Sequence, residues 1–177
     1  MSDPLDQISQ QVKKKRNFDT PPLHLWHPPL SGDIDILITR DGTWYHDGDK
    51  IQRETIVQLF ASILRREEDG DYYLVTPAEK WRIKVELHPL VVVDVEQTCS
   101  DDEPVIRAQL NTGKYYTVDA EHPLFAEPAA QGVAALRLPH NLAAIFNRAA
   151  WYRLAEMIQE KDGQLLVTSA GRDYILG

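Results

Sequence analysis

The sequence has few of the features that usually identify a function. Its 177 residues include one cysteine, Cys99, so a disulfide within the chain is excluded. The longest apolar run, Leu90–Val93, is far too short to span a bilayer. The N-terminus has no apolar secretory segment after its charged residues. We therefore expect a cytoplasmic protein that does not enter a membrane.

Positive charge is also scarce. The chain has 19 Lys and Arg against 27 Asp and Glu, which gives a formal net charge of −8. A protein that follows an extended nucleic acid needs a broad basic surface to neutralise the phosphates. This composition excludes such a partner, but it permits a small anionic ligand in a locally basic pocket.

Motifs of known catalytic chemistry are missing. The sequence has no Gly-x-Ser-x-Gly elbow, no phosphate-binding P-loop and no Gly-x-Gly-x-x-Gly fingerprint. Asp33 and Asp35 would share one strand face, but their spacing matches no metal motif, and His24 and His27 lie among prolines. We expect no catalytic residues, no metal and no cofactor. A hydrolase would need a nucleophile or a metal that the sequence does not provide.

One segment of the chain occurs twice. Leu74–Ile83 (LVTPAEKWRI) returns 92 residues later as Leu166–Ile175 (LVTSAGRDYI). Each copy follows an amphipathic segment that ends at Asp-Gly. The repeat predicts an α+β fold of two hairpin–helix–hairpin units with antiparallel sheets, which bury their apolar faces together. The predicted divisions are a flexible tail over 1–20, a first repeat with a proline-rich arm over 21–90, and a second repeat over 91–177.

Periodicity and turn residues locate the elements of each repeat. Apolar residues at helical spacing predict helices over 53–68 and 147–161. Four prolines between 21 and 29 predict an extended arm of polyproline type, held to the core by Leu23, Trp26 and Leu30. Alternating apolar residues bounded by turns predict strands over 34–39, 44–46, 72–75, 80–87, 91–98, 105–110, 115–118, 133–138, 165–168 and 173–176.

The candidate anion-binding residues are cations. Lys80 and Arg82 alternate with apolar residues along one predicted strand, so they share a face. With Arg53 or Arg148 nearby, this face could hold a phosphate group. The alternative is an ordinary solvated strand face.

Aromatic and polar residues complete the candidate site. Trp26, Trp44 and Tyr152 could stack against a base. Glu79 has no counterpart in the second copy, so it is either a polar wall of the pocket or a turn residue in a surface salt bridge. His122 could donate to the ligand, or it caps a turn before Pro123.

Several stretches resemble the bacterial domain-of-unknown-function family 1285. The most specific are the Pro-Pro…Trp…Pro-Pro…Gly-Asp string over 21–35 and Leu-Val-Thr-Pro-x-Glu-Lys over 74–80. Weaker similarity covers 41–53, 59–66, 122–124 and 148–154. The resemblance implies a duplicated core, a pleckstrin-homology-like second half, a nucleotide-type ligand between the halves and a role in signalling. It implies no established activity or cofactor.

Two functions follow as hypotheses. The first is a non-enzymatic regulatory protein that binds a small anionic, nucleotide-like ligand where the two repeats join. The alternative is a protein-interaction adaptor that uses the proline-rich arm and exposed aromatic residues.

Overall fold

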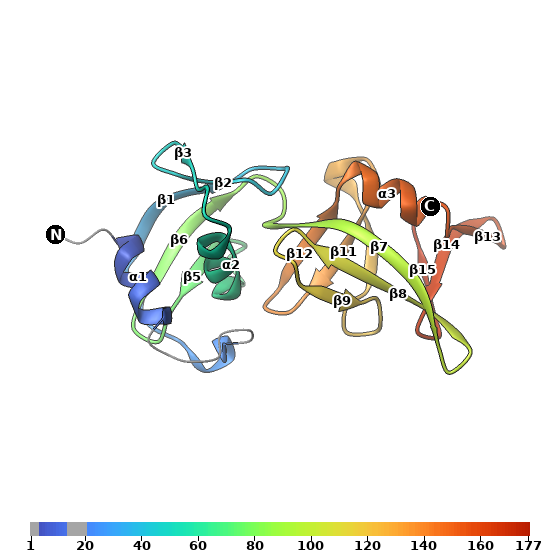
Figure 1. The fold of residues 1–177 in the computed structure, drawn as a ribbon, viewed down its shortest axis with the longest axis horizontal. Helices are drawn as coiled ribbons and strands as arrows, with labels where there is room; N and C mark the ends of the chain where they lie inside the picture. Colours follow the sequence, from blue (N-terminus) through green and yellow to red (C-terminus); the bar gives the residue numbers. More distant parts are fainter. Residues whose placement is uncertain (1–3, 14–20) are drawn as a thin grey trace. The chain divides into compact units, whose positions relative to one another are not determined.

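The structure, a computed structural model, describes residues 4–13 and 21–177. Half of the predicted tail over 1–20, namely residues 1–3 and 14–20, lies outside the described residues. Backbone contacts divide the chain into unit 1, Met1–Glu86, and unit 2, Leu87–Gly177. The division falls four residues before the boundary predicted at 90/91. Figure 1 draws both units.

Unit 1 is built on a six-stranded mixed sheet. Its order is β3-β2-β1-β6-β5-β4. The strands are β1 (Gly32–Ile38), β2 (Trp44–His46), β3 (Asp49–Lys50), β4 (Leu64–Arg66), β5 (Tyr72–Val75) and β6 (Lys80–Val85). The central strands β1 and β6 run parallel, and the other neighbours are antiparallel. The prediction of purely antiparallel sheets is wrong at this central pair, because β1 and β6 meet only after four intervening strands.

Helices cover the core of unit 1. Ile34, Ile36 and Ile38 alternate with exposed or half-exposed residues along β1, so one face of this strand is buried. Helix α2 (Glu54–Ser62) buries Phe60, whose ring lies 6.4 Å from that of Trp44. Helix α1 (Pro4–Lys13) contacts α2 and fully buries Ile8.

Unit 2 contains a second six-stranded sheet and a smaller one. The large sheet has the order β10-β11-β12-β7-β8-β9 and again a parallel central pair, β7 with β12. Its strands are β7 (Leu90–Ser100), β8 (Glu103–Leu110), β9 (Tyr115–Thr117), β10 (Leu124–Glu127), β11 (Val133–Leu138) and β12 (Leu142–Phe146). Helix α3 (Arg148–Ala155) follows, and the small antiparallel sheet comprises β13 (Gln159–Lys161), β14 (Gln164–Ser169) and β15 (Arg172–Ile175).

The duplication lies in the large sheets. In each, the first three strands are antiparallel neighbours that proceed outward from the centre of the sheet, and the next three return so that the last strand lies parallel beside the first. The repeated sequence does not mark equivalent strands of these sheets. Its first copy forms β5 and β6 of a large sheet, and its second forms β14 and β15 of the small sheet.

The two copies also turn differently. Val75 pairs with Lys80 across a four-residue turn, whereas Ser169 pairs with Arg172 across a two-residue turn. Both copies nevertheless end a segment of one helix and three antiparallel strands. The repeated sequence therefore reflects this shared segment of one helix and three strands, and not equivalent positions in the large sheets.

Both predicted helices are too long. The end of the predicted helix 53–68 is β4, because Leu64 is fully buried and pairs with Leu74. The end of the predicted helix 147–161 is β13, which pairs with β14. In both cases pairing with a neighbouring strand outweighs local helix propensity.

The N-terminal segments also differ from expectation. Residues of the predicted tail form α1, in which Leu5 and Ile8 lie one helical turn apart and Ile8 is buried. The predicted extended arm contains a single 3-10 turn, η1 (Leu23–Leu25), because Pro21 and Pro22 lack amide donors but their carbonyls accept from Leu23 and Leu25. A second 3-10 turn, η2 (Pro128–Ala130), lies in unit 2.

Candidate functional site

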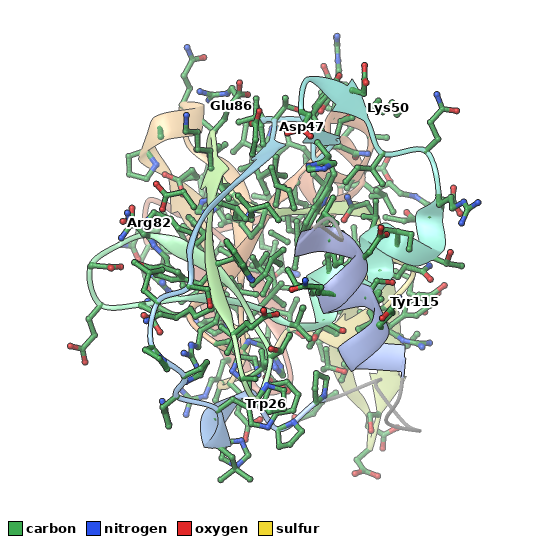
Figure 2. All side chains as sticks on the ribbon, turned by 90° about the vertical axis from the view of Figure 1, so that its left-hand side faces the viewer. Trp26, Asp47, Lys50, Arg82, Glu86 and Tyr115 are labelled. Carbon is green, nitrogen blue, oxygen red and sulfur yellow. The ribbon has the colours of Figure 1, made fainter. Side chains whose placement is uncertain are left out.

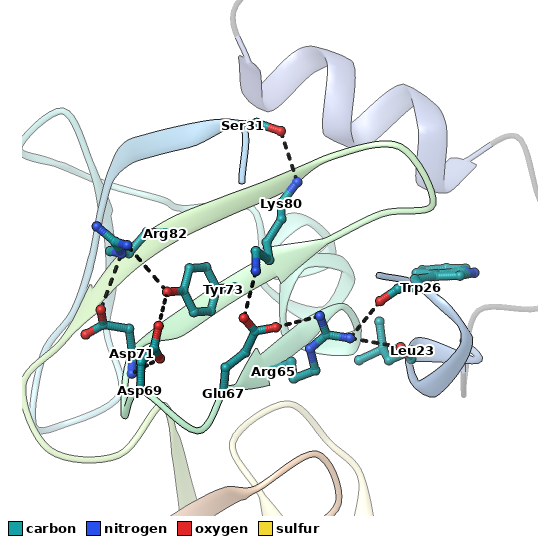
Figure 3. Close-up of polar contacts among 10 residues, drawn as sticks. All are labelled: Leu23, Trp26, Ser31, Arg65, Glu67, Asp69, Asp71, Tyr73, Lys80 and Arg82. Carbon is teal, nitrogen blue, oxygen red and sulfur yellow. Dashed lines mark hydrogen bonds and ion pairs between the residues drawn. The ribbon is translucent and has the colours of Figure 1, made fainter. Parts of the chain in front are cut away.

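A row of charged and aromatic residues crosses the sheet of unit 1. Strand register aligns Asp33 of β1 with Arg82 of β6, Arg82 with Tyr73 of β5, and Tyr73 with Arg65 of β4. Cross-strand neighbours on one face lie close enough to interact. Figure 3 shows Tyr73 between two cations of β6, with Lys80 Nζ 4.8 Å and the Arg82 guanidinium 5.7 Å from the centre of its ring.

Glu67 joins two cations at the β4 end of the row. Its carboxylate lies 2.7 Å from Arg65 Nη2 and 2.7 Å from Lys80 Nζ. The side chains of Arg65, Glu67 and Lys80 are 12%, 24% and 18% exposed. Burial would raise the pKa of Glu67, but hydrogen bonds from Lys80 and Arg65 outweigh it and hold the pKa below its ordinary value. We name these three residues the arm anchor.

Arg82 is surrounded by acceptors at the other end of the row. It lies 3.3 Å from Asp33 and 3.3 Å from Asp71, and its Nη2 is 3.5 Å from the Tyr73 hydroxyl. That hydroxyl donates to Asp69 at 2.5 Å, which raises the pKa of Tyr73. Arg82 is thus neutralised by carboxylates on both sides.

The arm anchor holds residues 21–31, which we call the arm. Arg65 Nη1 donates to the carbonyl of Leu23 at 3.0 Å and to that of Trp26 at 2.8 Å. At the far end of the arm, the Ser31 amide donates to the Lys80 carbonyl at 2.7 Å, and the Lys80 amide donates to Ser31 Oγ at 3.1 Å. Figure 2 places Trp26 at the opposite end of unit 1 from Asp47 of the β2–β3 turn and Lys50 of β3.

The arm is buried on one side and exposed on the other. Leu23 and Trp26 are 1% and 9% exposed, as expected for residues that hold the arm to the core. Leu25 is 67% exposed and Leu30 is 46% exposed, so Leu30 does not hold the arm to the core. The exposed side of a firmly held loop is a surface that another molecule can contact.

The predicted anion-binding cations belong to different elements of the two units. Lys80 and Arg82 belong to the network of unit 1, where carboxylates already neutralise them. Arg53 precedes α2 and is exposed. Arg148 begins α3 of unit 2, where its Nε lies 3.2 Å from the hydroxyl of Tyr152 and its guanidinium lies over that ring.

The predicted stacking residues also lie in different environments. Trp26 is buried on the side of the arm that faces the core, and Trp44 is 2% exposed in the core of unit 1. Tyr152 is 56% exposed on α3. Of the three, Tyr152 is therefore the ring that a ligand can reach without a change in the fold.

Glu79 and His122 both lie in turns. The Glu79 amide donates to Thr76 Oγ1 at 3.0 Å within the β5–β6 turn. His122 Nδ1 lies 3.1 Å from Asp119, and its ring meets the edge of Tyr116. Both residues take part in local turn structure in unit 1 and unit 2, respectively.

Sequence reasoning missed a buried pair in unit 2. His88 Nε2 lies 2.5 Å from Glu127 Oε2, and the two side chains are 10% and 12% exposed. The His88 ring meets the edge of Phe125, and its Nδ1 has no hydrogen-bond partner among the residues that the structure describes. Nothing in the sequence links His88 to Glu127, which lies 39 residues away.

This pair predicts an acid-dependent stability. Burial would raise the pKa of Glu127, but hydrogen bonds with His88 and with the Ala129 amide hold it below the ordinary value of 4.5. The ionised carboxylate therefore stabilises unit 2 above about pH 4.5, and this contribution is lost as the pH falls through the lower folded pKa. We expect E127Q to reduce the steepness of acid destabilisation, measured by urea unfolding at several pH values. E160Q, at an exposed carboxylate, is the control; equal slopes for E127Q and wild type would contradict the prediction.

Within residues 4–13 and 21–177, no group of three His, Cys, Asp or Glu side chains is placed to hold a metal ion. In the same residues, no helix is long and apolar enough to cross a membrane. The geometry defines a two-unit α+β protein whose described polar clusters are paired internally.

Comparison with known proteins identifies the family. The model of the N-terminal domain of unknown function DUF1285 matches residues 21–87, and the model of the C-terminal domain of the DUF1285 proteins of unknown function matches residues 89–176. The chain belongs to the DUF1285 family. No curated protein sequence matches the chain.

Two solved structures are similar. A DUF1285 protein from Silicibacter pomeroyi DSS-3 is 35% identical with a TM-score of 0.87, over 99% of this chain and 96% of that one. A DUF1285 protein from Shewanella baltica OS155 is 29% identical with a TM-score of 0.55, over 68% of this chain and 90% of that one. These similarities support the fold and leave the function to be argued from the residues.

Proposed function

We propose that the protein is a non-enzymatic regulatory adaptor, and that the arm is its protein-binding surface in unit 1. The observation that supports the proposal is the exposure of Leu25, at 67%, on a loop held by two hydrogen bonds from one arginine. A large apolar side chain that is held in water is stabilised when a partner covers it. A fixed loop also loses little conformational entropy on binding.

The arm presents an apolar ridge to this partner. Pro22, Leu25, Pro29 and Leu30 are exposed, while the alternate anchors Pro21, Leu23, Trp26 and Pro28 are buried. The partner therefore offers an apolar or aromatic groove. Exposed aromatic residues, which the sequence suggested for this role, contribute less here because Trp26 faces the core.

Capture experiments test the adaptor. The wild type should capture a partner protein from a lysate of the organism that produces it. We expect L25D to fail to capture that partner, because a charge replaces the contacting apolar group. The matched control is L165D, at a leucine of unit 2 that is 45% exposed. Recovery of the same partners by L25D and wild type would remove the arm from the proposal.

A small anionic, nucleotide-like ligand is a second candidate, favoured by Arg148 and Tyr152. Among the predicted site residues these two form an exposed cation–aromatic pair, with the guanidinium 5.4 Å from the ring centre. A phosphate could pair with Arg148 while a base stacks on Tyr152. The family resemblance that suggests this ligand also implies a pleckstrin-homology-like unit 2, and both remain proposals.

A thermal-shift series tests the ligand. Millimolar ATP, GTP and AMP should raise the melting temperature of the wild type, since a ligand that binds only the folded state stabilises it by mass action. R148A and Y152A should abolish the shift, and R172A, at an exposed cation of unit 2, should retain it. A wild type that none of the three nucleotides stabilises would contradict this candidate.

A further inference from the structure

Beyond Val95, strand β7 has an edge that no other strand of residues 4–13 and 21–177 pairs with. We propose that this edge, Glu96–Ser100, binds an extended, positively charged segment of another protein as an added strand. The proposal concerns unit 2 and does not depend on the arm. It rests on the direction of the backbone groups along β7 and on the charges around them.

The pairing of β7 shows where the free edge begins. On one side β7 pairs with β8 as far as Ser100, which lies opposite Glu103. On the other side β12 pairs with Leu90, Val91 and Val92 only. Among the described residues, no further strand pairs with β7, and all five residues from Glu96 to Ser100 are exposed.

The partners of β8 reveal which groups of β7 point outward. Pro104, opposite Cys99, has no amide hydrogen, and its carbonyl accepts from the Ala170 amide. Ile106, opposite Gln97, donates its amide to Ser169 Oγ, and its carbonyl accepts from the Val118 amide. Neither residue is therefore hydrogen-bonded to β7.

The backbone groups of Gln97 and Cys99 consequently face the free edge of β7. In an antiparallel pair, residues opposite each other either exchange both hydrogen bonds or direct both groups away. The amides and carbonyls of Gln97 and Cys99 point away from β8. They present two donors and two acceptors at the spacing of a strand, which is the pattern that an added strand pairs with.

The structure also limits this edge at its inner end. Val95 is the next residue of β7 whose amide points away from β8, and this amide donates to Asp94 Oδ1 at 2.9 Å. Arg153 of α3 pairs with the same carboxylate, and α3 lies against β7. These contacts occupy the edge up to Val95 and leave the segment beyond it open.

Charge selects the partner. Glu96 and the hairpin tip, Asp101, Asp102 and Glu103, are all exposed carboxylates. Arg107 pairs with Glu96 at 3.5 Å, and its guanidinium lies 4.0 Å from the centre of the Tyr115 ring. Arg153, which pairs with Asp94, also lies close enough to Glu96 to attract it. Pairing of two β7 edges from two copies would bring both acidic tips together, which is unfavourable. A lysine- or arginine-rich strand is complementary.

A backbone substitution tests the edge directly. Gln97→Pro removes a backbone amide that points away from β8, so no hydrogen bond between β7 and β8 is lost. The native Pro104 already occupies an equivalent position on the facing strand. Gln97→Val keeps the amide and is the matched control. The probe is a labelled peptide of alternating lysine and valine, Lys-Val-Lys-Val-Lys-Val, and its glutamate counterpart is the charge control.

We expect the lysine peptide to bind wild type and Q97V, and to bind Q97P about tenfold more weakly, since ladder hydrogen bonds and strand approach are lost. The glutamate peptide should not bind. Equal affinity of Q97P and Q97V would overturn the proposal in favour of charge alone. Failure of the lysine peptide to bind at millimolar concentration would also overturn the proposal. So would a wild-type dimer that the Q97P substitution dissociates, because the edge would then bind a second copy of the chain.

Hydrogen exchange provides a second measurement that needs no variant. The lysine peptide should slow exchange at the amides of Gln97 and Cys99 in the wild type. The amides of Glu96 and Thr98, which point toward β8, serve as the internal reference. Unchanged exchange at Gln97 and Cys99 in the presence of bound peptide would overturn strand addition even if Q97P failed to fold.

Discussion

Replacement of Arg65 by alanine should destabilise unit 1 by about 2–4 kcal/mol, the largest effect expected of any polar substitution in this unit. The side chain is 12% exposed and makes three charge-assisted hydrogen bonds, to the carbonyls of Leu23 and Trp26 and to Glu67. Its loss leaves two carbonyls and a half-buried carboxylate short of donors. Urea unfolding followed by tryptophan fluorescence measures the change.

The control for R65A is R82A on the same row of the sheet. The Arg82 side chain is 39% exposed and its ion pairs face solvent, so we expect a much smaller loss of stability than for R65A. R65K keeps the charge but cannot reproduce the forked contacts, so it should fall between R65A and wild type. If R65A and R82A lose equal stability, the arm is not held by Arg65.

Replacement of Ser169 by alanine should destabilise unit 2 by about 2–3 kcal/mol. Ser169 is fully buried, and its hydroxyl accepts from the Ile106 amide at 2.8 Å and donates to the Val118 carbonyl at 2.7 Å. Alanine leaves both backbone groups buried without a partner. The hydroxyl also joins the small sheet to the large one, so the substitution should loosen β14 and β15 together.

Thr168 provides the comparison for Ser169. Its hydroxyl donates to Asp173 in an exposed position, so T168V should change stability by about 0.5 kcal/mol or less. Hydrogen exchange of the small sheet in S169A reports the loosening. Wild-type protection of the β14 amides in S169A would show that other contacts carry this junction.

Local pattern identified most strands of the fold but could not supply their pairing. The alternation of Ile34, Ile36 and Ile38 predicts β1 because a half-buried strand has a period of two. β12 (Leu142–Phe146) is buried throughout and has no such alternation, so it was missed. The parallel pairs are set by contacts between distant segments, which periodicity does not encode.

The helices show where tertiary contacts override local signals. Apolar spacing through Ile63 and Leu64 continues the helical pattern of α2, yet both residues are fully buried in and beside β4. That error also hid the arm anchor. On a helix, Arg65 and Glu67 would not share a face, whereas alternate residues on an extended strand do.

The candidate site was therefore predicted in part. The shared face of Lys80 and Arg82 follows from strand alternation, and the register of β6 agrees with it. Their carboxylate partners come from Glu67 and Asp71, around the β4–β5 turn, and from Asp33 on a strand 49 residues away. Only the fold brings these groups together, which is why a basic face in the sequence is a balanced network in the structure.

The parallel central pair of each large sheet has a consequence for how such a protein can arise. The chain enters at the beginning of the first strand and leaves at the end of the sixth, on opposite rims of the sheet, since these two strands point the same way. A second copy can thus start where the first finishes, and four residues connect β6 to β7. Tandem fusion of an ancestral gene needs no returning crossover in this topology.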